Sequence, residues 1–144
     1  MEKTGLAADH AGYELKESIR ALLDRKQIPY IDYGTCTAES VNYAVFGHKL
    51  AKAVESGEVS RGIAVCGTGN GIGMTLNRHK GIRAALCWNE EITRLARAHN
   101  DANVLALPGR FLSADLAEKM VEIFFRTPFE GGRHQERIKE QTRF

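Results

Sequence analysis

Short, almost continuously apolar runs alternate along this chain with longer stretches in which apolar residues recur every three or four positions. Continuous apolar runs of about five residues are typical of strands in a parallel sheet that is covered on both faces. The runs that predict strands are TGLAA (4–8), IPYID (28–32), GIAVC (62–66), IRAALC (82–87) and VLAL (104–107).

The stretches between these runs have the period of amphipathic helices, because each set of apolar residues lies on one helical face. The sets are Leu15, Ile19, Leu22 and Leu23; Phe46, Leu50, Ala53 and Val54; Ile92, Leu95 and Ala96; and Leu116, Met120, Ile123 and Phe124. The tail GGRHQERIKEQTRF is polar and predicts a last helix that lies on the surface.

The alternation of strands and helices predicts a doubly wound, open, five-stranded parallel sheet, that is, a Rossmann-like three-layer α/β/α fold with right-handed crossovers. No linker, repeat or low-complexity segment divides the 144 residues, so we expect a single domain over 1–144. In such sheets ligands bind at the loops that leave the carboxyl ends of the strands. These loops carry Asp9 and His10, Gly34 and Thr35, Cys66, and Pro108, Gly109 and Arg110. We therefore expect an acid, an imidazole, a thiol and a guanidinium to meet at this edge.

The densest glycine segment, CGTGNGIG (66–73), follows the third predicted strand. It does not fit the dinucleotide fingerprint G-x-G-x-x-G, because Ile72 or Met74 stands where the third glycine is needed, and it lacks the Gly-Lys-Ser/Thr that ends a Walker loop. The interpretation that is left is a strand–loop–helix turn whose backbone N–H groups form an anion site. The alternative is a tight turn that needs glycine only for packing.

Cys66 stands directly before this loop. The partial positive charge at a helix N-terminus favours a thiolate, and a thiolate there can act as a base. The alternative is a small buried core residue, which is the interpretation that we give Cys87.

His99 ends the helix that begins near Asn89, and it precedes a predicted strand. Because a helix between parallel strands returns the chain to the amino edge of the sheet, we expect His99 at the edge opposite Cys66. A catalytic His99 would then serve a neighbouring subunit, whereas the alternative is a histidine whose cation favours the helix dipole. Arg133 and Arg137 are one helical turn apart and can hold one anion between them, unless both are simply solvated.

No two histidines stand at the spacing of metal ligands, so we expect no metal site and interpret His48 and His79 as surface or packing residues.

A net charge of +2 without a run of basic residues argues against nucleic-acid or membrane binding and favours a small-molecule partner. Three cysteines, Cys36, Cys66 and Cys87, without a C-x-x-C pair predict reduced thiols. Because no signal peptide and no apolar run near ~18 residues is seen, we expect a cytoplasmic protein.

Six ordered motifs together resemble the ribose-5-phosphate isomerase B family, which includes the galactose-6-phosphate isomerase subunits. The motifs are AADHAG (7–12), DYGT (32–35), CGTGNGIG (66–73), GIRAAL (81–86), AHNDANVLALPGR (98–110) and GGRHQERI (131–138). They are spread over nearly the whole chain, so the resemblance is specific.

The resemblance implies an aldose–ketose isomerase that needs no metal and no cofactor. Cys66 would move a proton between C2 and C1 of an open-chain sugar phosphate through an enediolate, and His99 would open the furanose ring with assistance from Asp9. The glycine loop would stabilise the developing charge, and the other residues would surround the phosphate and the sugar hydroxyls. The residues so placed around the substrate are His10, Tyr43, Gly67, Thr68, Gly69, Asn70, Gly71, Asn100, Arg110, Arg133 and Arg137.

The sequence departs from the family at Asn42-Tyr43-Ala44, where many members read Asp-Tyr-Pro, and this leaves the sugar open. We expect interconversion of ribose 5-phosphate and ribulose 5-phosphate. The alternatives are an isomerase of a six-carbon sugar phosphate such as allose 6-phosphate or galactose 6-phosphate, a non-catalytic sugar-phosphate or nucleotide sensor, and a redox-regulated thiol protein. We also expect a homodimer with shared active sites, while a tetramer stays open.

Overall fold

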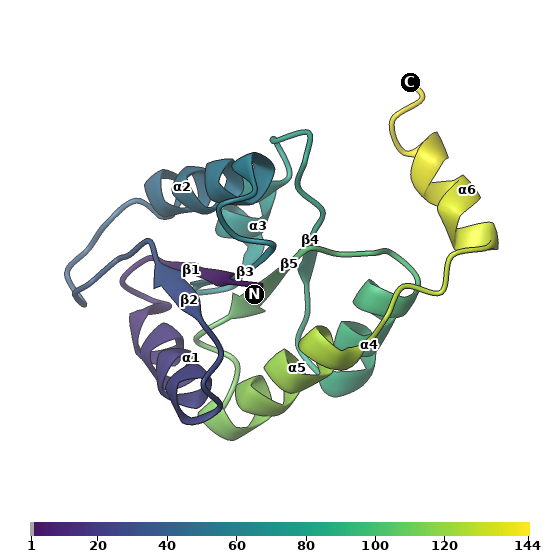
Figure 1. Cartoon of the computed structure of the whole chain (residues 1–144). Helices are drawn as coiled ribbons and strands as arrows, with labels where there is room; N and C mark the ends of the chain where they lie inside the picture. The colour runs from purple at the N-terminus through teal and green to yellow at the C-terminus, as the bar shows by residue number, and fades with distance from the viewer. Residues whose placement is uncertain (1) are drawn as a thin grey trace.

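The computed structural model describes residues 2–144, which form one five-stranded sheet and six helices (Figure 1). In chain order the elements are β1 Thr4–Ala8, α1 Tyr13–Arg25, β2 Tyr30–Asp32, α2 Tyr43–Ser56, β3 Arg61–Cys66, α3 Asn70–Leu76, β4 Ala84–Leu86, α4 Glu90–Ala98, β5 Val104–Pro108, α5 Ala114–Arg126 and α6 Arg133–Glu140.

All strand pairs are parallel, and the strand order is β2-β1-β3-β5-β4. The chain starts in the middle of the sheet, winds to β2 on one side and then crosses to β3 on the other. This reversal is the switch point at which open α/β sheets bind ligands, and it lies between the carboxyl ends of β1 and β3. The structure confirms the predicted doubly wound fold.

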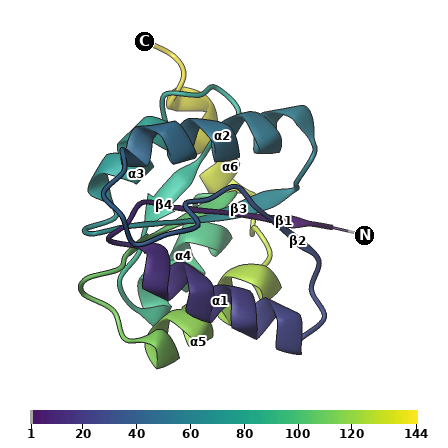
Figure 2. The ribbon, with the colours of Figure 1, turned by 90° about the vertical axis from the view of Figure 1, so that its left-hand side faces the viewer.

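Side chains of successive strand residues point to opposite faces, so each face of the sheet has its own core. Leu6, Ile63 and Leu105 pack with α1, α4 and α5, whereas Ala64 and Cys66 pack with α2 and α3. Figure 2 shows α2 and α3 on one side of the sheet and α1, α4 and α5 on the other. Because both faces are covered, the central strands are apolar throughout, as their continuous apolar runs predict.

The strand boundaries agree with the expectation within one residue at each end for β1, β3 and β5, and differ by more at the two edge strands. β2 covers 30–32 and β4 covers 84–86, although their apolar runs cover 28–32 and 82–87. An edge strand pairs on one side only, and Ile28 and Ile82 pack into the two cores before the pairing begins.

The last helix, α6, extends from the main body of the molecule at the C-terminal end of the chain, as Figure 1 shows. Of its residues, only His134 is buried. Among residues 2–144 no helix combines the length and apolar character needed to span a membrane.

Candidate active site

The loop after β1 is fixed by the carboxyl group of Asp9, whose side chain is 6% exposed. Asp9 Oδ1 accepts the N–H of Gly12 at 3.0 Å, and the N–H of Asp9 donates to the carbonyl of Val65 on β3 at 3.3 Å. A Cβ on Gly12 would collide with that same carbonyl of Val65. Only glycine therefore lets α1 start so close to β3, which holds Asp9 beside the end of that strand.

His10 connects this loop to the segment before α2. Its Nδ1 accepts the N–H of Val41 at 3.1 Å, so in the neutral imidazole the proton lies on Nε2. His10 Nε2 is therefore a hydrogen-bond donor, as a phosphate ligand must be.

The glycine loop follows Cys66, which is buried at the end of β3. Gly69 has a φ of +78°, a conformation that favours glycine, and a Cβ there would lie 3.1 Å from the carbonyl carbon of Leu107. The N–H groups of Gly71 and Ile72, in the first turn of α3, find no acceptor within residues 2–144. The loop thus turns sharply against β5 and leaves free donors next to Cys66, as the anion-site interpretation predicts.

Two further side chains close around this loop. A Cβ on Gly67 would lie 3.2 Å from Nη1 of Arg110, and the backbone N–H of Arg110 donates to the carbonyl of Gly67 at 3.0 Å. Tyr43, the first residue of α2, packs its ring where a Cβ of Gly71 would be. Asn42 caps α2 by accepting the N–H of Ala44 at 2.9 Å, so the residue that departs from the family pattern anchors this end of the helix.

The carboxyl edge of the sheet therefore gathers part of the predicted site. The residues that lie there are Asp9, His10, Tyr43, Cys66, Gly67, Thr68, Gly69, Asn70, Gly71 and Arg110. They supply an acid, two groups that can hold a phosphate, a thiol and free N–H donors, which suits proton transfer on a small anionic substrate.

The other predicted residues, His99, Asn100, Arg133 and Arg137, lie at the amino edge. His99 is the C-cap of α4, and the carbonyl of Asn100 accepts from Nε and Nη2 of Arg83, which precedes β4. β5 separates this edge from the other, and its five residues at ~3.3 Å each span roughly 15 Å. The structure confirms that His99 and Cys66 of one chain lie at opposite edges.

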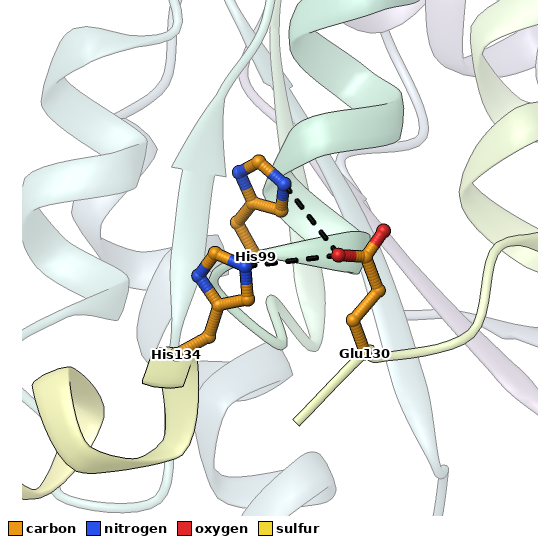
Figure 3. Close-up of side chains that lie close together, drawn as sticks. All are labelled: His99, Glu130 and His134. Atoms are coloured by element: carbon orange, nitrogen blue, oxygen red, sulfur yellow. Dashed lines mark ion pairs between the residues drawn. The ribbon is translucent and has the colours of Figure 1, made fainter. Parts of the chain in front are cut away.

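His99 lies beside two residues that the sequence reasoning did not assign, His134 and Glu130 (Figure 3). The rings of His99 and His134 stack with centroids 4.1 Å apart and planes 15° apart. Nε2 of each ring lies 3.7 Å from Oε1 of Glu130. Burial and the neighbouring charges of His99 and Arg133 hold the pKa of His134 below its usual value, against the opposing effect of Glu130.

The expectation that no histidines pair at ligand spacing is wrong for the folded chain, because the possible ligand atoms of these three residues lie within 4.8 Å of one another. The signal in the sequence was the i, i+4 spacing of Glu130 and His134, but His99 joins them only through the tertiary fold. Nε2 of each ring faces the same carboxylate oxygen of Glu130 at 3.7 Å, so the carboxylate forms an ion pair with whichever imidazole is protonated.

His48 and His79 pack against each other, and Cys87 is the core residue that the sequence analysis expects. Nδ1 of His48 lies 2.7 Å from Nε2 of His79, whose Nδ1 lies 3.0 Å from Oε1 of Glu55. Cys87 is a buried core residue, and burial raises its pKa to about 11. Cys36 is exposed.

A family model described as Ribose/Galactose Isomerase matches residues 4–141. Ribose-5-phosphate isomerase B of Escherichia coli is 40% identical over 99% of this chain and 95% of its own. The crystal structure of a ribose 5-phosphate isomerase from Thermotoga maritima is 45% identical with a TM-score of 0.97, and the match covers 99% of both chains. Ribose-5-phosphate isomerase B from Mycoplasma genitalium with bound ribulose-5-phosphate is 38% identical, with a TM-score of 0.93 over 98% of this chain and 94% of that one.

Proposed function

The chain belongs to the ribose/galactose isomerase family, and we propose that it interconverts ribose 5-phosphate and ribulose 5-phosphate. The observation that carries this proposal is the cluster at the carboxyl edge, where Asp9, Cys66 and the free N–H donors of the glycine loop lie beside Arg110. A relative with bound ribulose-5-phosphate that has the same fold supports the choice of a five-carbon substrate.

In the proposed reaction the sugar ring opens first. His99 gives a proton to the ring oxygen as the bond from that oxygen to C1 breaks, and Asp9 assists by accepting the proton of the hydroxyl on C1. The product is an open-chain aldehyde, and no electron leaves or enters the substrate. The other oxygen of the Asp9 carboxyl group is free for this task, because Oδ1 already accepts the N–H of Gly12.

Isomerisation then takes place at Cys66. The thiolate removes the proton from C2, which gives an enediolate, and returns it to C1, while the proton of the hydroxyl on C2 passes to the oxygen on C1, so that C2 becomes the ketone and C1 carries the new hydroxyl. The N–H groups of Gly71 and Ile72 stabilise the negative charge that develops on the oxygens. His10 and Arg110 hold the phosphate, which keeps the reacting carbons beside the sulfur.

We also propose that a second copy of the chain completes each site with its own His99, Asn100, Arg133 and Arg137. The ~15 Å between the two edges of one chain supports this, because no side chain reaches across it. Exposed apolar side chains near the carboxyl edge and on the α2–α3 face give a partner surface to cover. They are Val45, Met74, Trp88 and Phe111. A two-fold axis makes two equivalent sites from such an arrangement.

The test is conversion of ribose 5-phosphate in the presence of a chelator, with two serine variants. Cys66→Ser should lose at least a hundredfold in kcat, since a hydroxyl is scarcely ionised at neutral pH. Cys36→Ser, at an exposed thiol, is the matched control and should keep the parental rate. Activity of Cys66→Ser within tenfold of the parent would contradict the assignment of the base.

A six-carbon sugar phosphate is the second candidate, and the observation in its favour is Asn42 beside Tyr43, where the family pattern that the sequence resembles has an acid. Comparing kcat/KM on ribose 5-phosphate and allose 6-phosphate decides between the two. A preference above tenfold for the longer sugar would replace the five-carbon proposal.

A further inference from the structure

Glu130 is held next to His99 by the backbone as well as by its side chain. Its N–H donates to the carbonyl of Ala98, the last residue of α4, at 2.9 Å. Directly after it, Gly131 and Gly132 have φ values of +70° and +58°, and this turn brings the start of α6 back toward α4. The chain path thus sets the position of the Glu130 backbone beside the end of α4, within reach of His99 for its carboxylate.

The two imidazoles are the only ion-pair partners of Glu130 within the described chain. Arg94, the neighbouring cation on α4, is engaged with Glu91 at 2.6 Å. The carboxylate is therefore available to both histidines, and it faces Nε2 of each ring, as Figure 3 shows.

The stack fixes the remaining freedom of the His99 ring. His134 is the less exposed of the two, with 10% of its side chain accessible against 36% for His99, so it forms the packed wall and His99 the accessible ring. One face of the His99 ring is covered by the stack with centroids 4.1 Å apart, and the carboxylate 3.7 Å from Nε2 favours the ring orientation that turns a protonated Nε2 toward it. Nδ1 of His99 is then the nitrogen left to exchange a proton with a substrate.

We propose that Glu130 is a positioning residue for ring opening, which holds the His99 imidazole against the wall of His134 in the orientation that the reaction needs. This rests on the proposed function, in which His99 protonates the ring oxygen of the sugar. Glu130 itself touches no reacting atom. Its contribution should appear in the rate of ring opening and not in the affinity for the sugar phosphate.

Ring opening can be measured apart from isomerisation, because the α and β anomers of ribose 5-phosphate interconvert only through the open chain. In a Cys66→Ser background, anomer exchange at C1 is followed by two-dimensional exchange NMR with ¹³C-labelled sugar. We expect the Cys66→Ser protein to accelerate exchange over buffer, and Glu130→Gln added to it to remove at least nine-tenths of that acceleration. Glu130→Asp, which keeps the charge, should retain more of the acceleration than Glu130→Gln.

The matched control is Glu136→Gln, in the first turn of α6, where the carboxylate is exposed and pairs with Lys139 at 3.6 Å. It should leave the exchange rate within twofold. The Kd for ribose 5-phosphate and the melting temperature should be the same for both variants, since a positioning role changes neither. In the parental background, Glu130→Gln should lower kcat about tenfold with KM unchanged.

Several results would overturn the proposal. These are exchange in the Glu130→Gln protein within twofold of its background, an equal loss in Glu136→Gln, or a loss that appears in KM alone. The proposal would also be overturned if the parent isomerises ribose 5-phosphate but the Cys66→Ser protein does not accelerate anomer exchange, because there would then be no ring-opening activity that Glu130 could assist. Failure of the parent to isomerise ribose 5-phosphate would instead count against the proposed function, and the isomerase assay reports this separately.

Discussion

Mixing two inactive variants tests whether the active site is shared between two copies of the chain. Cys66→Ser removes the base at the carboxyl edge, and His99→Ala removes the ring-opening group at the amino edge. Each homodimer then has two defective sites. A mixed dimer has one site with both residues intact and one with neither.

The expected recovery follows from this geometry. Random exchange of equal amounts makes half of the dimers mixed, and each mixed dimer has one working site of two, so about a quarter of the parental activity should return. If one chain instead formed its own site, its His99 would have to cross the roughly 15 Å of β5, and mixing would restore nothing.

The assay is isomerase activity of the two variants before and after subunit exchange, with exchange shown by mass spectrometry of a tagged chain. A same-edge pair, Cys66→Ser with Asp9→Asn, is the matched control. Both changes lie at the carboxyl edge, so no mixed dimer has an intact site and no activity should return. Recovery in this control, or none in the first mixture despite exchange, would refute the shared site.

Three further changes test one packing contact of the site and two charged contacts elsewhere in the fold. Gly71→Ala puts a methyl group where the Tyr43 ring packs, so kcat/KM should fall at least tenfold while urea unfolding shows a loss of about 1–3 kcal/mol, and parental kinetics would contradict that contact. Lys16→Met removes a side chain that is 1% exposed and pairs with Asp32 at 2.7 Å; because Asp32 keeps Arg20 at 3.6 Å, the loss should be about 1.5–3 kcal/mol in the same unfolding assay, and an unchanged free energy would show that the pair adds nothing. A backbone N–H and an imidazole hold the pKa of Glu55 below its usual value, so its stabilisation is present above the pKa of the unfolded chain and is lost as the pH falls through the folded pKa. Glu55→Gln should therefore lower the melting temperature at pH 7 and lower it progressively less as the pH falls below the usual carboxyl pKa, and an equal effect at neutral and acid pH would contradict this role of the carboxylate.

The parts of the fold that could be predicted from the sequence are those in which burial on both faces dictates composition. The runs at 4–8, 62–66 and 104–107 are apolar because helices cover both faces of the central strands, and they match β1, β3 and β5 within one residue at each end. At 28–32 and 82–87 the apolar runs include residues, such as Ile28 and Ile82, that pack into the core ahead of the first paired strand residue. Composition alone therefore does not mark where these strands start.

The strand topology was sufficient to predict which site residues meet at the carboxyl edge of the sheet, but not which residues meet at the amino edge. Residues that follow β1, β3 and β5 meet because parallel strands in register end together, as Cys66 and Pro108 do. The group of His99, Glu130 and His134 depends on where the chain goes after α5. Two consecutive glycines predict a turn there, but not its direction, which is set by the hydrogen bond from Glu130 to Ala98.

The two edges also differ in how firmly their residues are held, and this bears on the proposed division of the chemistry. At the carboxyl edge, glycines at 12, 69 and 71 lie where a Cβ would meet neighbouring atoms, so the loops around Cys66 have little room to move. Proton transfer between adjacent carbons needs such accuracy, because a misplacement of about 1 Å can cost a factor of a hundred. Ring opening involves atoms further along the sugar, and its group lies where α4 ends against α6, a helix that extends from the main body of its own chain (Figure 1). If the partner supplies His99, the full active site forms only when two chains associate. A single chain has every one of these residues in its sequence but no complete active site.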